Sequence, residues 1–449
     1  PNAKFTPAFR NRIWDGKIRL FNLNTKQLYI GLLPYVKSFC EERDYSIELK
    51  NDLINADSFS RKEAEDFLKD TLTGKFKARD YQFKSFVHCV RNKRALIVSP
   101  TASGKSFIIY MLSKWYNNKK KLIIVPTISL VQQMKSDFIE YGFDENKIYT
   151  ITAGVDKQTD ESVVISTWQS IYKLPKKYFE QYNVVIGDEC HLYKAKSLTS
   201  IMTKLVNAEY RFGFTGTLDD MQTNKLVIEG LFGKVKQYVT TKDLIDKNTL
   251  AEFKIKCLVL KHKDEDCKII SKAKYQEEID FLVGNKKRNE FIKNLAVSLN
   301  GNSLLLFQYV EKHGKLLYDL CKKSVKKERP VFFVYGGVGA DERESIRQIT
   351  ETQRNAIIVA SFGTFSTGIN IRNLHNVVFC SPSKSRIRNL QSIGRGLRRG
   401  NNKDKAILYD ISDDLRYKSK VNYTLDHFAE RIKLYNSEQF EYKLYNINL

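Results

Sequence analysis

The chain has 449 residues, of which 42% are hydrophobic and 12% aromatic, a composition that excludes wholesale disorder and allows two or three domains with substantial cores. Its 75 Lys and Arg residues against 51 Asp and Glu give a formal net charge of +24, which indicates a polyanionic partner. Nucleic acid is favoured over an anionic membrane surface, because the sequence shows no long apolar span, signal peptide or basic amphipathic anchor. We therefore expect a soluble, intracellular protein without a membrane partner. A general lysine enrichment is the alternative explanation of the charge.

The chain opens with a segment, residues 1–72, that we expect to form a small α+β accessory domain. Aromatic and basic residues alternate over residues 9–21, a pattern that predicts a hairpin. The sequence starts at Pro1 rather than at a methionine, so a missing upstream segment is one interpretation.

Two series of strand and helix patterns follow this segment. Short apolar runs, separated by stretches long enough for helices, predict parallel sheets with helices on both faces. The first series of predicted strands comprises residues 95–98, 122–125, 149–152, 163–166, 184–186 and 212–215, and the second comprises 255–260, 304–307, 331–335, 357–360, 377–380 and 406–409. We therefore predict an α/β protein with domains at residues 1–72, 73–240 and 241–449, the last ending in a helical tail.

A phosphate-binding loop is predicted between the first strand of the first series and the helix after it. Residues 99–106 match the pattern G-x-x-x-x-G-K-[ST], except that Ser99 replaces its first glycine. In such a strand-to-helix turn the backbone N–H groups face an anion, Lys105 reaches the β and γ phosphates, and the Ser106 hydroxyl takes one Mg²⁺ position. A glycine-containing turn without function is the alternative for this motif taken alone.

An acidic motif strengthens the nucleotide interpretation. Residues 188–191 read Asp-Glu-Cys-His and directly follow a predicted buried strand, at the edge where open parallel sheets place their ligands. We expect Asp188 to hold Mg²⁺ and Glu189 to act as the general base on the attacking water. Because the acids, the lysine and the hydroxyl occur together, an ATPase is favoured over two solvated acids.

A basic segment of the second domain is predicted to complete the site. Arg395 and Arg398 lie three residues apart, on one face of a predicted helix, from which both can reach a γ phosphate. Arginines so placed stabilise the charge of the transition state and link hydrolysis to domain closure. A solvated basic helix is the alternative.

Taken together, the segments resemble the motifs of the superfamily 2 helicases of DExH type, in the family's order. The matching segments are Arg79-x-Tyr81-Gln82 (adenine-reading motif), residues 100–106 (motif I), Pro126-Thr127-x-x-Leu130-x-x-Gln133 (motif Ia), 166–170 (strand contact), 188–191 (motif II), 215–217 (motif III), 366–370 (motif V) and Gln391-x-x-Gly394-Arg395-x-x-Arg398 (motif VI). This superfamily often lacks the first loop glycine, which accounts for Ser99.

The resemblance implies two RecA-like domains, the cofactors ATP and Mg²⁺, and a role for each motif residue. It implies ATP binding for Arg79, Tyr81, Gln82, Thr101, Ala102, Ser103, Gly104, Lys105 and Ser106, and catalysis for Lys105, Asp188, Glu189, Arg395 and Arg398. It implies a coupling role for His191, Thr215, Thr217 and Gln391, and DNA contact for Thr127, Thr167, Thr367 and Gly368.

A closer likeness, over nearly the whole chain, is to the recombination and repair helicases of T-even bacteriophages. Residues 9–20, 167–169, 188–192, 365–369 and 445–449 carry it. It implies an ATP-dependent DNA helicase that unwinds and branch-migrates junctions, forks and R-loops, with an accessory domain that grips duplex DNA. RNA–DNA hybrids and single-strand-binding or recombination proteins are further implied partners, in a host cytoplasm. A motor subunit of a restriction or RNA-processing complex and an ATP-switched nucleic-acid clamp are the alternatives.

Overall fold

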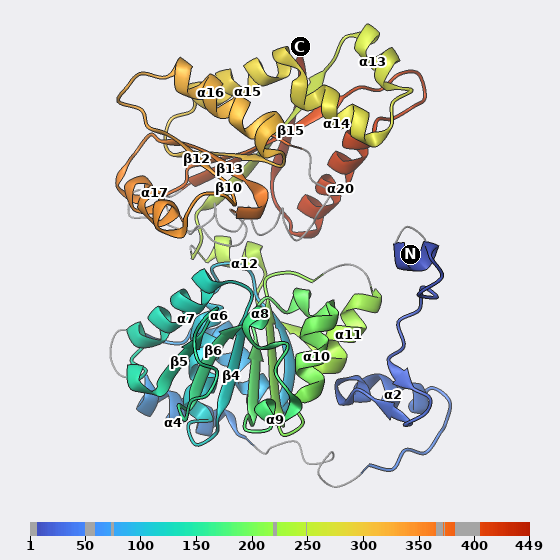
Figure 1. Ribbon diagram of the computed structural model, residues 1–449, viewed down its shortest axis with the longest axis vertical. Coiled ribbons are helices and arrows are strands. Elements are labelled where there is room, and N and C mark those ends of the chain that lie inside the picture. Colours follow the sequence, from blue (N-terminus) through green and yellow to red (C-terminus); the bar gives the residue numbers. More distant parts are fainter. Residues whose placement is uncertain are drawn as a thin grey trace. The chain divides into compact units, whose positions relative to one another are not determined.

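The computed structural model describes residues 7–49, 59–72, 76–218, 222–247, 249–364, 371, 373–381 and 405–449. The chain divides into two compact units, residues 1–99 with 104–238 and residues 100–103 with 239–449. Each unit is built on a seven-stranded sheet with flanking helices (Figure 1). The predicted α/β class, with two RecA-like parallel sheets, is confirmed. Among the described helices, none combines the length and apolar character that a membrane span requires.

The sheet of the first unit has the strand order β5-β6-β4-β7-β8-β3-β9, and all its pairings are parallel. Its strands are β3 (Arg94–Val98), β4 (Lys121–Val125), β5 (Ile148–Ile151), β6 (Val163–Thr167), β7 (Val184–Gly187), β8 (Tyr210–Thr215) and β9 (Val235–Gln237). Its helices include α4 (Arg61–Thr71), α5 (Asp80–Asn92), α6 (Lys105–Trp115), α7 (Ile128–Glu140), α8 (Trp168–Ile171), α9 (Lys176–Phe179), α10 (Lys196–Lys204) and α11 (Gln222–Phe232), with the short helix η4 (Cys190–Lys194). Six strands lie where they were predicted, to within a residue or two at their ends.

This sheet is buried on both faces, as parallel sheets require. Along β3, Ala95 and Ile97 enter a core cluster formed with α5, α6 and α7, whereas Leu96 enters a second cluster formed with α10 and α11. Figure 1 shows α6 and α7 on one side of the sheet and α10 and α11 on the other. The two-sided burial explains why the strands are short, continuous apolar runs.

The sheet of the second unit has the order β12-β13-β11-β14-β15-β10-β16 and is also parallel throughout. Its strands are β10 (Glu252–Lys261), β11 (Ser303–Phe307), β12 (Val331–Val334), β13 (Ile357–Ser361), β14 (Asn376–Phe379), β15 (Lys405–Asp414) and β16 (Tyr442–Asn448). Its helices include α12 (Thr241–Asp246), α13 (Asp264–Ile270), α14 (Tyr275–Gly284), α15 (Lys286–Ser298), α16 (Lys315–Ser324), α17 (Ala340–Thr352) and α20 (Tyr423–Ser437). The expected helical tail contains α20 and then an edge strand, β16, because pairing with β10 stabilises a segment whose own sequence is largely polar and exposed.

The N-terminal segment contains α1 (Pro7–Arg10), a hairpin of β1 (Phe21–Asn22) and β2 (Gln27–Leu28), the short helix η2 (Ile30–Leu32) and α2 (Leu33–Glu41). The hairpin expected over residues 9–21 is therefore displaced toward the C-terminus. The side chain of Asn22 explains the shift, because its Oδ1 accepts hydrogen bonds from the backbone N–H groups of Asn24 (3.0 Å) and Thr25 (3.1 Å) and so forms the turn there.

Candidate nucleotide site

The phosphate loop runs from the end of β3 to the start of α6. The backbone N–H of Ser99 donates to the carbonyl of Thr215 (2.9 Å), which fastens the loop to β8. Ala102 (φ 65°) and Gly104 (φ 80°) both adopt left-handed backbone conformations. Lys105 begins α6, and its Nζ donates to the carbonyl of Ser99 (3.3 Å). The loop therefore has the tight strand-to-helix turn that a phosphate cradle needs.

Gln82, one of the predicted adenine-reading residues, lies against this loop and also contacts Arg79. Gln82, at the start of α5, donates from Nε2 to the carbonyl of Gly104 (3.4 Å) and accepts the backbone N–H of Arg79 at Oε1 (2.9 Å). The Arg79 guanidinium donates to the hydroxyl of Tyr81 (3.0 Å). A Cβ atom on Gly104 would lie 2.5 Å from Nε2 of Gln82. Glycine at this position thus serves both its backbone conformation and the approach of Gln82.

The acidic pair lies at the end of β7, on the same edge of the sheet. The backbone N–H of Asp188 donates to the carbonyl of Ile124 (3.0 Å), and the N–H of Glu189 donates to Oδ1 of Asp188 (3.0 Å). Burial, and then the charge of Glu189, raise the pKa of the Asp188 carboxyl to about 6, although Lys105 opposes the shift. The carboxyl group of Asp188 is buried and that of the adjacent Glu189 is partly exposed, and together they form a site that a cation would stabilise.

A chain of polar contacts connects the acidic motif to β8. His191, which is buried, has its Nδ1 3.3 Å from Oε2 of Glu189 and 3.0 Å from Oγ1 of Thr215. The Thr215 hydroxyl donates to the carbonyl of Thr217 (2.8 Å). The structure therefore brings together three of the residues expected to couple ATP to DNA.

Ser106 makes a contact that the sequence did not indicate. Its hydroxyl lies 3.1 Å from the hydroxyl of Tyr141, the residue that follows α7. Carboxylate and hydroxyl oxygens are ligands that Mg²⁺ prefers, so the side chains of Asp188 and Ser106 suit such an ion. No cluster of three or more His, Cys, Asp or Glu with metal-binding geometry occurs in the described part of the chain. A Mg²⁺ ion here would therefore depend on phosphate oxygens and water for its remaining ligands.

Two of the predicted DNA-contacting threonines lie on this same edge. β4 and β6 pair with Val125 opposite Thr167, so Thr167 ends β6 and Thr127 follows the end of the adjacent β4. Thr127 caps α7 by accepting the N–H of Leu130 (3.4 Å), and the Thr167 hydroxyl lies 2.8 Å from that of Ser170. Five of the predicted residues lie outside the described ranges, namely Thr367, Gly368, Gln391, Arg395 and Arg398, whereas Thr101 and Ser103 lie in the described phosphate loop.

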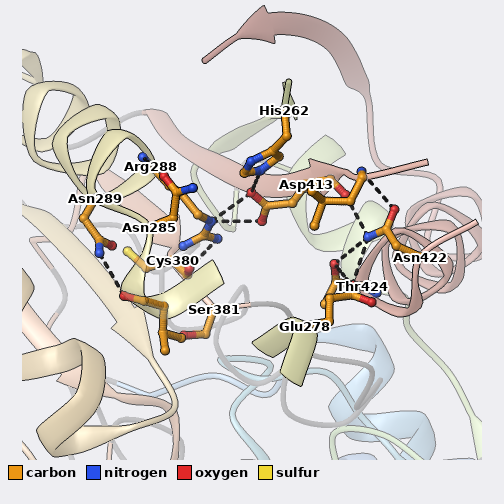
Figure 2. A network of polar contacts seen from close by, with 12 residues as sticks. His262, Glu278, Asn285, Arg288, Asn289, Cys380, Ser381, Asp413, Asn422 and Thr424 are labelled. Carbon is orange, nitrogen blue, oxygen red and sulfur yellow. Dashed lines mark hydrogen bonds and ion pairs between the residues drawn. The ribbon is translucent and has the colours of Figure 1, made fainter. Parts of the chain in front are cut away.

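The second unit carries a buried polar network at the carboxyl ends of its strands, which the sequence did not indicate (Figure 2). Arg288 of α15, fully buried, donates from Nε to both carboxylate oxygens of Asp413 (2.9 and 3.0 Å) and from a terminal nitrogen to the carbonyl of Cys380 (2.9 Å). Nε2 of His262 lies 3.0 Å from the same carboxylate. Asp413 comes after the apolar residues of β15 much as Asp188 follows β7, and that placement is the signal that would have identified it.

A second histidine belongs to this neighbourhood. His313 has one ring nitrogen 3.1 Å from the Ser381 hydroxyl and the other 3.2 Å from Oδ1 of Asn289. Burial, and then the charge of Arg288, lower the pKa of His313 to about 3. The ring is therefore neutral at physiological pH and acts as a hydrogen-bonding group.

Comparisons with known proteins show which families the chain resembles. The chain matches the family descriptions "Type III restriction enzyme, res subunit" over residues 41–220, "DNA helicase UvsW, N-terminal" over 2–50 and "Helicase conserved C-terminal domain" over 286–400. The ATP-dependent DNA helicase uvsW of Enterobacteria phage T4 is 36% identical, and the match covers 99% of this chain and 93% of that protein.

Two solved structures extend the comparison. The crystal structure of T4 UvsW is 34% identical, covers 100% of this chain and 93% of its own, and has a TM-score of 0.49. A fragment of a putative HsdR subunit of a type I restriction enzyme from Vibrio vulnificus YJ016 is 17% identical, with 86% and 73% coverage and a TM-score of 0.61, and therefore shares the fold. Because the phage T4 relative matches almost the whole chain at this identity, the protein belongs to the superfamily 2 helicases, in the family of UvsW, and is an ATP-dependent DNA helicase.

Proposed function

We propose that this helicase acts on branched DNA, which it unwinds and branch-migrates at junctions, forks and R-loops. The observation that carries ATP-driven action is the meeting of Lys105, Asp188, Glu189 and the His191–Thr215 pair at one edge of the first sheet. The likeness to the phage T4 uvsW helicase and the net charge of +24 support DNA as the partner. In the proposed organisation, residues 1–72 grip duplex, residues 73–240 bind ATP, and residues 241–449 form the second helicase domain.

We propose the following division of labour in ATP hydrolysis. The N–H groups of the loop, from Thr101 to Gly104, hold the phosphates, and the Lys105 ammonium binds the β and γ phosphates. Asp188 and Ser106 hold Mg²⁺, which supplies charge neutralisation to the phosphate oxygens.

Glu189 accepts a proton from the attacking water while the water oxygen bonds to the γ phosphorus. The bond between the γ phosphorus and the β–γ bridging oxygen breaks, and ADP leaves. Arg395 and Arg398 stabilise the charge that spreads over the γ-phosphoryl oxygens. Arg79, Tyr81 and Gln82 orient the base.

Coupling to DNA follows from the polar chain that starts at Glu189. Once the γ phosphate is gone, the contacts of Glu189 rearrange, and His191 passes the change to Thr215 on β8. We propose that Thr217 and Gln391 extend this chain. Thr127 and Thr167, with Thr367 and Gly368, hold the sugar-phosphate backbone, contacts that position a strand without reading its sequence.

A comparison of DNA substrates tests the proposal. Unwinding and ATP turnover are measured on forked DNA, four-way junctions, R-loops and duplex RNA at one stated salt concentration, because phosphate contacts make affinity salt-dependent. We expect the branched DNA substrates to be processed several-fold faster per ATP than linear duplex of equal length. Equal rates on linear and branched DNA, or a preference for duplex RNA, would contradict it.

One alternative has a specific observation in its favour. The match of residues 41–220 to the restriction-enzyme family suits a translocating motor whose ATP use serves another protein's chemistry. That function predicts DNA-stimulated ATP turnover with little strand displacement by the isolated chain.

Under the favoured proposal the chain works in a host cytoplasm beside single-strand-binding and recombination proteins and also acts on RNA–DNA hybrids.

A further inference from the structure

The N-terminal module, residues 7–49, is joined to α11 by a hydrogen bond to a buried acid. The hydroxyl of Tyr35 on α2 donates to Oε2 of Glu229 (2.6 Å), and Oε1 of the same carboxylate accepts the backbone N–H of Val235 at the start of β9 (2.9 Å). Glu229 has no exposed surface. Burial, and then the carboxylate, raise the pKa of Tyr35 to about 12, so the hydroxyl stays protonated and keeps donating.

Glycines allow the two backbones to approach closely at this joint. A Cβ atom on Gly31 would lie 2.0 Å from the carbonyl oxygen of Glu229 and 2.9 Å from the backbone nitrogen of Gly233. A Cβ on Gly230 would lie 3.0 Å from Cβ of Tyr29. Because the atoms facing Gly31 are backbone atoms, no side-chain rotation makes room for a larger residue there.

The last residue of α11 packs directly beneath the nucleotide motifs. The ring centroids of Phe232 and of Tyr193 in η4 are 5.0 Å apart. A Cβ atom on Gly187 would lie 2.8 Å from the nearest carbon of each ring. A Cβ on Gly213 would lie 3.0 Å from Phe232. Gly187 immediately precedes Asp188, and Gly213 lies two residues before Thr215. Helix α11 therefore contacts the strand ends that present the acidic pair and the coupling threonine.

We infer that α11 joins the N-terminal module to the phosphate site as one rigid body, and that Gly31, Tyr35 and Glu229 are positioning residues for ATP-driven DNA remodelling. The inference rests on the proposed function in one respect, namely that the module grips DNA. Contacts made by the module then move with the ATP-binding unit, because its anchor at Glu229 and the ring of Phe232 lie on the same short helix. Loosening the joint leaves ATP hydrolysis intact but lowers the amount of DNA unwound per ATP hydrolysed.

Two substitutions in the full chain test the joint against matched controls. Tyr35→Phe removes only the hydroxyl bonded to Glu229, and Tyr45→Phe removes a hydroxyl from a tyrosine of the same module that is 60% exposed. Gly31→Ala places a methyl group against backbone, whereas Gly284→Ala on α14 meets nothing within 4 Å. The readouts are amide hydrogen exchange over residues 27–41 and 222–232, ATP turnover without DNA, and base pairs unwound per ATP hydrolysed.

We expect unwinding per ATP to fall about threefold for Tyr35→Phe, as for a lost hydrogen bond, and about tenfold for Gly31→Ala. Exchange should rise in both segments, DNA-free turnover should stay within about twofold, and both controls should match the parent chain. Unchanged exchange in both test variants would refute the joint, and faster exchange with unchanged unwinding per ATP would refute its positioning role. Lys17 and Lys26 are exposed lysines of the module, so duplex affinity is measured in parallel for the double variant Lys17→Glu, Lys26→Glu. Unchanged affinity in that variant would contradict DNA gripping by the module, and the exchange result would still decide the joint.

Discussion

Substituting Gly104 with alanine tests the construction of the phosphate loop, and the chain offers a matched control in Gly154. Both glycines have φ of +80°, but a Cβ on Gly104 would lie 2.5 Å from Nε2 of Gln82, whereas a Cβ on Gly154 meets nothing within 4 Å. Alanine in a left-handed conformation costs about 1–2 kcal/mol at either position. The difference between the two variants therefore isolates the contact with Gln82.

The larger loss of folding stability expected for Gly104→Ala follows from the hydrogen bonds that Gln82 would lose. Its amide is the far end of a flexible side chain, so it rotates away and loses its bonds to the carbonyl of Gly104 (3.4 Å) and the N–H of Arg79 (2.9 Å). These two bonds together contribute about 1–2 kcal/mol. We expect Gly104→Ala to destabilise the chain by about 2–4 kcal/mol and Gly154→Ala by about 1–2 kcal/mol.

The assay is thermal unfolding together with titration of a fluorescent ATP analogue. Gly104→Ala should unfold at a lower temperature than Gly154→Ala and bind the nucleotide at least about tenfold more weakly, because the displaced Gln82 no longer supports the base site and the loop. Gly154→Ala should keep the parent affinity. Equal affinities and unfolding temperatures for the two variants would refute the role assigned to the Gln82 contact.

Three further predictions concern the acidic motif and the buried network of the second unit. Glu189→Gln should lower ATP turnover by about 10²- to 10⁴-fold while nucleotide binding persists, and turnover near the parent rate would show that another group is the base. His313, whose pKa is lowered to about 3, stays neutral when folded, so its contribution to stability is complete above its ordinary pKa of 6.5 and is lost as the pH falls from there toward 3. His313→Gln should therefore flatten the decline of the melting temperature between pH 7 and pH 5, and an identical decline would contradict this. Asp413→Asn leaves the buried Arg288 without its counter-charge and should cost about 3–5 kcal/mol by chemical unfolding, whereas Asp15→Asn, in an exposed pair with Arg19, should leave stability unchanged.

The strands were predictable because the sheets are buried on both faces. Residues 121–125 of β4 and 303–307 of β11 are buried throughout, so after their first residue they appear in the sequence as unbroken apolar runs of strand length. β9 and β16 escaped prediction because they are sheet edges with mostly exposed, polar residues. Their conformation is decided by pairing with β3 and β10, which lie far away in the sequence.

In the candidate site, too, local motifs were predictable and contacts between distant residues were not. The loop from Ser99 to Ser106 and the acids at 188–189 are local motifs, and their spacing alone carries the chemistry. The contact between Ser106 and Tyr141 joins residues 35 apart, and the pair Arg288–Asp413 joins residues 125 apart, so neither leaves a local pattern. Arg288 in particular closes a run of basic residues, 286–288, that is typical of a solvated helix end.

The central claim is that ATP hydrolysis at this site drives DNA remodelling, and the most direct test is steady-state ATP turnover with and without a DNA junction, measured for the parent chain and for Lys105→Ala. We predict turnover that rises at least about tenfold with DNA in the parent and is abolished in the variant, which should still bind the junction with the parent's affinity. Turnover in the parent chain that does not respond to DNA would contradict the account.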